Sequence, residues 1–199
     1  MMLKTLKHDA KADFLLEKGM EILWSKGYNG TSVSDIVKAA EVPKGSFYFY
    51  FESKEDFVVR AIEKYFEMMF TPAKEVLQNK EVSPLQRLLN FHDFRIGVLK
   101  DEMECKRGCM ACNIGSEMAE HNEQIRNTIL VKEQLVLKLI TEVIQEAKDL
   151  GEIKNPMKAE DMAAFIEDAG KGAMVSMKER KSSYPIDNVL YVIKNILLK

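Results

Sequence analysis

The chain has 199 residues, a length that fits one domain or two small ones and can bury a substantial core. Hydrophobic residues make up 46% and charged residues 30%, which excludes a disordered, collagen-like or disulfide-scaffold chain. The 29 Lys and Arg residues nearly balance the 31 Asp and Glu residues, and the net charge is −2. Binding to nucleic acid or anionic lipid by bulk charge alone is therefore excluded, although a local basic patch is not.

Cysteine content and hydropathy indicate the cellular compartment of the protein. Three cysteines, an odd number, favour a reducing compartment over a secreted disulfide framework. The amino-terminal residues lack the apolar core of a signal peptide. No stretch approaches the roughly 20 apolar residues that span a bilayer. We therefore expect a soluble cytoplasmic protein that does not contact a membrane.

The hydrophobic pattern predicts an all-α chain, because apolar residues recur at three- and four-residue spacing between helix caps. The first helices are expected over residues 11–26, 33–40, 44–51 and 54–70, the last of these ending near Thr71-Pro72. Further helices are expected over residues 84–99, 123–150, 159–180 and 186–198. Residues 101–115, which contain all three cysteines and two glycines, are expected to be less regular.

The second and third of these helices have the spacing of a helix-turn-helix. Ser32, followed by Asp35, resembles a capping box at the start of the first, and Pro43 is expected in the first turn of the second. In such a unit the second helix lies in the major groove with its amino-terminal residues facing base edges. Lys44 to Ser46 would lie there, where the helix dipole also favours a phosphate. Aromatic residues 48–50 offer hydroxyl groups and flat faces to the DNA.

Residues 31–36, 42–51 and 54–55 resemble the TetR family of transcriptional repressors, a likeness that covers roughly residues 10–65. It implies a three-helix DNA-binding domain over residues 1–70, with the helix-turn-helix at about 32–51. A helical ligand-binding and dimerisation domain over residues 71–199 would follow. The implied partners are double-stranded DNA with a palindromic operator, a second copy of the chain and a small-molecule effector.

The helix-turn-helix pattern and the resemblance together assign a set of DNA contacts. These residues are Ser32, Val33, Lys44, Gly45, Ser46, Tyr48, Phe49, Tyr50 and Lys54. Phe47 and Phe51 are expected in the core instead, one helical turn apart. The chain departs from the family pattern at Glu41, where a turn glycine is common, at Pro43, where a capping serine is common, and at Phe49, where a polar side chain is usual.

The segment from Arg107 to Met118 resembles a stretch in one branch of that family, in parts of which a cysteine at the position of Cys109 senses electrophiles or oxidants. A thiol near Lys106 and Arg107 would have a larger thiolate fraction. Its oxidation or alkylation would then alter packing next to the linking helix. Alternatively, Cys109 and Cys112 are small buried hydrophobic residues.

Other sites have weaker signals. A zinc site built from Cys105, Cys109, Cys112 and His121 lacks a recognised ligand pattern, so we expect neither a metal nor a cofactor. A cavity in the helical bundle is the default effector site. Its lining candidates, beside the two cysteines Cys109 and Cys112, are Phe91, Phe94, Met110, Ile114, Phe165 and Met174.

The sequence thus predicts a transcriptional repressor that a small-molecule, electrophile or oxidant signal releases from its operator. The signal would shift the population of the larger domain, and the helix over residues 54–70 would carry the change to the DNA-binding unit. The alternative is a small all-α thiol-dependent enzyme or binding protein that uses Cys109 as its nucleophile. His121 is the one histidine near Cys109 in sequence, and no base with an orienting partner stands out, so we expect no enzyme.

Overall fold

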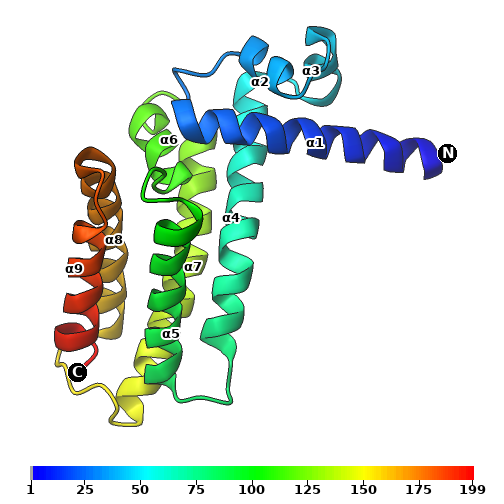
Figure 1. The fold of residues 1–199 in the computed structure, drawn as a ribbon. Coiled ribbons are helices and arrows are strands. Elements are labelled where there is room, and N and C mark those ends of the chain that lie inside the picture. Colours follow the sequence, from blue (N-terminus) through cyan, green and yellow to red (C-terminus); the bar gives the residue numbers. More distant parts are fainter. Residues whose placement is uncertain (1) are drawn as a thin grey trace. The chain divides into compact units, whose positions relative to one another are not determined.

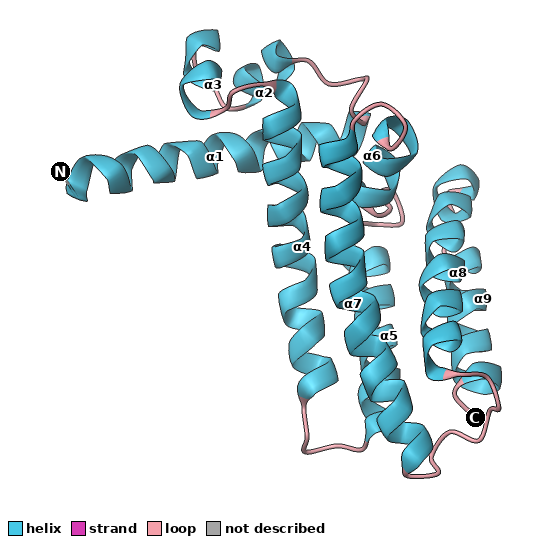
Figure 2. Ribbon diagram, turned by 180° about the vertical axis from the view of Figure 1, so that it is seen from behind, coloured by secondary structure: helices cyan, strands magenta, loops and turns pink. Residues whose placement is uncertain are grey.

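A computed structural model describes the backbone of residues 2–199 and the side chains of residues 10–199. Within that part of the chain every regular element is a helix (Figures 1 and 2), so the prediction of an all-α protein is confirmed. The helices are α1 (Met2–Lys26), α2 (Val33–Ala39), α3 (Lys44–Tyr50), α4 (Lys54–Gln78), α5 (Pro84–Gly97), α6 (Met110–Met118), α7 (Glu123–Asp149), α8 (Ala159–Arg180) and α9 (Tyr184–Val192). Short π-helical segments, Val98–Glu102 and Ile193–Leu197, directly follow α5 and α9.

The chain divides into two compact units, each made of segments that are separate in sequence. The first unit contains residues 1–65 and 110–130, and the second contains residues 66–109 and 131–199. Helices α4 and α7 each begin in the first unit and continue into the second. Helix α6 therefore belongs to the same compact unit as α1, α2 and α3.

Helix α4 continues past the proline where the sequence predicts its end. The prediction of a stop near Thr71-Pro72 was wrong, since α4 runs to Gln78 with Pro72 in its interior. An interior proline removes one hydrogen bond and costs about 3 kcal/mol. Beyond it, Ala73 and Leu77 are buried in the core of the second unit. Burial of these apolar side chains offsets the cost of the proline, because each buried CH₂ group contributes about 0.8 kcal/mol.

The segment expected to be irregular contains helix α6. The expectation for residues 101–115 was wrong from Met110 onward, because two glycines obscured a helical apolar face. Met110, Ala111, Ile114 and Met118 are buried on that face. Gly108 precedes the helix, so it does not interrupt it.

Three other helix ends differ from the predicted ones. Helix α1 begins at Met2 rather than near residue 11, because residues 2–10 contain no helix breaker. The predicted helices over 84–99 and 186–198 end in π-helical segments, in which backbone hydrogen bonds join residues five apart instead of four. The prediction for residues 159–180 matches α8 at both ends.

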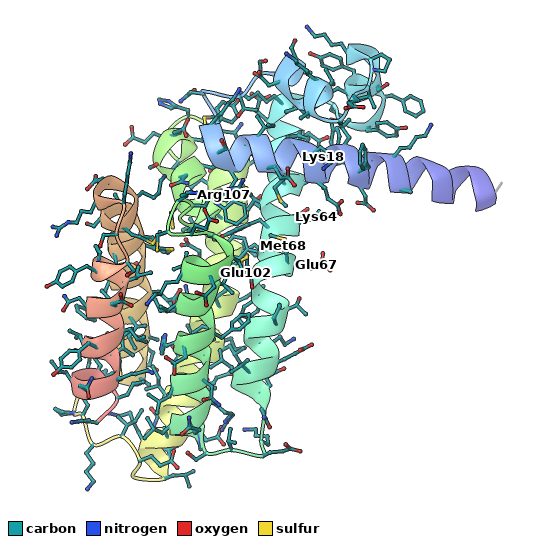
Figure 3. The ribbon with its side chains drawn as sticks, viewed as in Figure 1. Lys18, Lys64, Glu67, Met68, Glu102 and Arg107 are labelled. Carbon is teal, nitrogen blue, oxygen red and sulfur yellow. The ribbon has the colours of Figure 1, made fainter. Side chains whose placement is uncertain are left out.

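The first unit is organised around aromatic side chains. Phe47 and Phe51 are 0% and 2% exposed, so their predicted core position is confirmed. Their ring centroids lie 5.2 Å apart, and Phe57 of α4 lies 5.7 Å from Phe47 and 5.1 Å from Phe51. Lys64 of α4 donates to Glu17 of α1 at 2.9 Å, and Lys64 is labelled in Figure 3. Gly19 of α1 lies against the Phe57 ring, so helices α1, α3 and α4 share one small core.

The second unit has an apolar core of side chains from α4, α5, α7 and α8, and a buried histidine of α5 lies beside Phe91 of this core. His92 of α5 is 4% exposed, and its Nε2 atom has no hydrogen-bond partner in the structure. Burial, and secondarily the charges of Arg95 and Lys194, lower the pKa of His92 to about 3. The folded protein therefore holds this imidazole neutral over the physiological range.

His92 predicts a specific loss of stability in mild acid. Its pKa in the folded chain lies below the ordinary value of 6.5, so below about pH 6.5 the imidazole is protonated in the unfolded chain but not in the folded one. The unfolding free energy therefore decreases as the pH falls. Replacing His92 by leucine removes this penalty. The unfolding free energy of H92L relative to that of the native chain should therefore rise by roughly 2 kcal/mol as the pH falls from about 7.5 to about 5. Urea denaturation at the two pH values measures the gain, and an equal difference at both would contradict it.

Candidate nucleic-acid interface

Helix α2 begins with the predicted capping box. The Ser32 hydroxyl accepts a hydrogen bond from the Asp35 backbone N–H at 3.1 Å, and the Asp35 carboxylate accepts one from the Ser32 N–H at 2.8 Å. The hydrogen bond from the Ser32 hydroxyl, followed by that from its backbone, lowers the pKa of Asp35 to about 2. The box fixes the entry to the first helix of the motif, because it satisfies two amide groups that the helix leaves unpaired.

The turn between α2 and α3 is tight and contains a left-handed residue. Glu41 has a φ of 55°, a conformation that glycine adopts without strain. The Val42 N–H donates to the Val37 carbonyl at 3.0 Å and closes the turn. Pro43 occupies the N-cap position of α3, one residue before the predicted place, and makes no side-chain cap.

Helix α3 has a buried face and an exposed face. Phe47 faces the aromatic core, whereas Tyr48 and Phe49 are 57% and 67% exposed. Lys44 and Gly45 are also exposed, and a Cβ atom at Gly45 would meet no atom within 4 Å. The exposed side thus combines a cation, two large rings and a bare stretch of backbone, which are the groups that contact phosphates, bases and sugars in DNA.

The remaining predicted contact residues are less exposed. Val33, Ser46 and Tyr50 are half-buried, and Ser32 is exposed beside the capping box. Figure 1 shows α2 and α3 next to each other, near the beginning of α4. The structure therefore brings the predicted residues of α3 together on one short helix.

Lys54 lies in a different environment from the others. Its ammonium group donates to the Tyr28 carbonyl at 2.6 Å and lies 3.8 Å from the centre of the Tyr28 ring. Burial lowers the pKa of Lys54. The Tyr28 hydroxyl in turn donates to Glu55. Lys54 thus holds the turn after α1, a role that its place in the sequence does not predict.

Glu117 of α6 contacts the same turn, and nothing in the sequence predicts this contact. Its carboxylate accepts hydrogen bonds from the backbone N–H groups of Tyr28 and Asn29, at 3.2 and 2.8 Å. No local pattern could reveal this contact, because 88 or 89 residues separate the partners.

The three cysteines are all half-buried, and none forms a disulfide. Cys105 and Cys109 pack against a small apolar cluster that includes Met174. Lys106, which was expected to act on the Cys109 thiol, forms an ion pair with Glu104. Among the described side chains, no group of three or more His, Cys, Asp and Glu residues could hold a metal ion.

The suggested effector-contacting residues are divided between the two compact units. Phe91 and Phe94 belong to the large core of the second unit, and Met174 belongs to the cluster beside Cys109. Met110 and Ile114 are fully buried in the first unit. Phe165 is 51% exposed on α8.

Across the part of the chain that the structure describes, no helix is long and apolar enough to cross a membrane. A short anchored helix with an exposed cationic and aromatic face, preceded by a capped helix and a tight turn, defines a helix-turn-helix DNA-binding protein. Residues 15–61 match the family model for bacterial regulatory proteins of the tetR family. Residues 84–192 match the model for the tetracyclin repressor-like C-terminal domain. The chain belongs to the TetR family of transcriptional regulators.

Similar proteins span nearly the whole chain. The transcriptional repressor DhaR of Mycobacterium sp. strain GP1 is 32% identical over 184 residues, which cover 92% of this chain and 90% of DhaR. The repressor NemR of Escherichia coli K12 is 26% identical over 196 residues, 98% of each chain. The crystal structure of a regulatory protein TetR from Rhodobacter sphaeroides has a TM-score of 0.85 at 26% identity, covering 93% of this chain and 97% of that one. The reduced form of E. coli NemR has a TM-score of 0.82 at 25% identity, covering 94% and 97%.

The left-handed turn residue predicts a stabilising substitution. A non-glycine residue in this conformation costs about 1–2 kcal/mol, which substitution with glycine would remove. The greater conformational freedom of glycine in the unfolded chain offsets part of that gain. Replacing Glu41 by glycine should therefore raise the unfolding free energy by up to about 1 kcal/mol. Urea denaturation measures the change. Glu52→Gly, an exposed glutamate in the same unit with no left-handed backbone, is the control and should not stabilise.

Proposed function

We propose that the protein is a homodimeric repressor that binds a palindromic operator through α3 and leaves it when Cys109 reacts with an electrophile or oxidant. The observation that carries this proposal is the face of α3, where Lys44, Tyr48 and Phe49 are exposed above a buried Phe47. Membership of the TetR family and the similarity to DhaR and NemR, both described as repressors, support it.

The surface of α8 and α9 supports a homodimer. Phe165, Val175, Tyr184 and Tyr191 are between 51% and 64% exposed on these two helices. A Cβ atom at Gly172 of α8, which is exposed two helical turns beyond Phe165, would meet no atom within 4 Å. Small residues beside large apolar ones allow the close approach of a second helix pair, and a two-fold axis brings the same face of each protomer together. We expect this face to form the dimer interface.

Dimerisation would also raise the affinity for DNA, which is expected to be weak for a single DNA-binding unit. Between Lys26 and Lys54 four lysines face three carboxylates, and Lys26 pairs with Asp35 at 3.4 Å. A single weakly basic head gains little from phosphate contacts. Two heads about one helical turn apart, roughly 34–36 Å, would double the contacts and require a two-fold symmetric operator.

The signal is proposed to act at Cys109. This thiol is half-buried against the cluster of Ala173, Met174, Met177 and Ile186, between α8 and α9. Adding a bulky or charged group to the sulfur would disrupt that apolar packing. Cys109 also immediately precedes α6 in the chain. The solved relative NemR is described as a reduced form, which is in keeping with a redox signal.

Loss of the α3 face should strongly weaken operator binding while the dimer persists. Each lost base or phosphate contact costs about 1–3 kcal/mol, so Lys44→Ala with Tyr48→Ala should weaken binding by well over tenfold. Fluorescence anisotropy with DNA from upstream of the protein's own gene, in the presence of competitor DNA, measures this. Lys138→Ala, an exposed lysine of α7, is the control. Unchanged binding by the double variant, with sedimentation showing a dimer, would refute the proposal.

Release by a thiol reagent should depend on one cysteine. Cys109→Ser should bind the operator with unchanged affinity but no longer dissociate when diamide or N-ethylmaleimide is added. Cys105→Ser and Cys112→Ser are matched controls, because both thiols are also half-buried. They should release DNA like the native chain. Release that persists in Cys109→Ser would show that the signal acts elsewhere.

A further inference from the structure

The turn between α1 and α2 is held by a carboxylate from a distant part of the chain. Glu117, in the last turn of α6, accepts the Tyr28 N–H through Oε1 at 3.2 Å and the Asn29 N–H through Oε2 at 2.8 Å. All three residues belong to the first compact unit, in which α6 packs against α1. One side chain thus satisfies two adjacent backbone donors just beyond the end of a helix, and charge-assisted bonds of this kind are about twice as strong as neutral ones.

The backbone beside the carboxylate is adapted to it. Gly27 has a φ of 73°, and a Cβ atom there would lie 2.1 Å from Glu117 Oε1. Any other residue at this position would push the carboxylate away from the turn. Gly27 therefore serves two purposes, since it ends α1 in the left-handed conformation and leaves room for Glu117.

The same turn is connected to the helix-turn-helix on its other side. The Tyr28 carbonyl accepts from the Lys54 ammonium group at 2.6 Å. The buried Thr31 hydroxyl donates to the Gly27 carbonyl at 2.7 Å, directly before the Ser32 cap of α2. Displacement of the turn would therefore shift the start of α2 and the start of α4 together. Helix α3 is attached to both, through the α2–α3 turn and through Phe57.

We propose that Glu117 is a positioning residue for DNA recognition: its carboxylate sets the turn at residues 27–30 and so fixes where the helix-turn-helix lies on α1 and α4. Glu117 does not itself contact DNA in this scheme. The inference rests on the proposed function for its DNA measurement, but its first consequence, protection of two backbone amides, does not require DNA.

Glu117→Ala tests the proposal with two separate measurements. Amide hydrogen exchange of Tyr28 and Asn29, followed by NMR without DNA, should become at least tenfold faster. Operator affinity by fluorescence anisotropy should fall about tenfold, while the melting temperature changes little because the carboxylate is partly exposed. Glu120→Ala removes the same charge from an exposed site just after α6 and should change neither quantity. Glu117→Gln keeps one acceptor oxygen and should restore part of both.

The outcomes separate this inference from the proposed function. Native amide exchange and native operator affinity in Glu117→Ala would overturn the positioning role. Faster exchange with native affinity would also overturn it, since the turn would then not matter for DNA recognition. A native chain that binds no operator would instead refute the proposed function, and the exchange measurement would still decide whether Glu117 holds the turn.

A second substitution tests the same contact from the other side. Gly27→Ala should displace the carboxylate and reproduce the faster exchange at Tyr28 and Asn29. Gly151→Ala is the matched control, because Gly151 has the same φ of 73° but no atom within 4 Å of its Cβ position. In the Glu117→Ala background, Gly27→Ala should cost little further operator affinity. Fully additive losses of affinity would mean that the two residues act independently and would contradict the contact's role.

Discussion

Helix α3, through which we propose that the protein binds DNA, depends on the burial of Phe47. Helix α3 has seven residues, too few to be stable in water without tertiary packing. Phe47 supplies that packing through ring contacts with Phe51 and Phe57, at centroid distances of 5.2 and 5.7 Å. Because one side of so short a helix is fixed in the core, Tyr48 and Phe49 must point outward. The exposure of two large apolar rings, which is costly in a free protein, follows from the same constraint.

Much of the first unit could be predicted from the sequence, because its signals are local. The Ser32–Asp35 capping box spans three residues, and the Phe47–Phe51 pair spans one helical turn. Each can be recognised without knowledge of the rest of the fold. The same holds for α8, whose two ends were predicted correctly from the apolar pattern between flanking turns.

The errors arose where tertiary packing outweighs local preference. Pro72 is a helix breaker by itself, yet the burial of Leu77 beyond it keeps α4 intact. The contact of the Lys54 ammonium group with the Tyr28 carbonyl and ring could likewise not be predicted from its spacing, and its contact with a phosphate stays a prediction. Glu117 is an ordinary glutamate in sequence, and only the fold brings it to a turn nearly ninety residues away. Long-range contacts of this kind have no signature in a single sequence.

The first compact unit is discontinuous, and this has a consequence for protein engineering. The amino-terminal helices share their unit with residues 110–130, so a cut after α4 would separate the DNA-binding segment from α6 and from buried residues such as Met110 and Ile114. A chimaera that joins only the amino-terminal segment to another sensor domain would expose the surface of α1 that α6 covers. It would also lose the hydrogen-bond acceptor Glu117. The transferable module is therefore the helix-turn-helix together with α6 and the start of α7, two stretches of chain that must be exchanged as a pair.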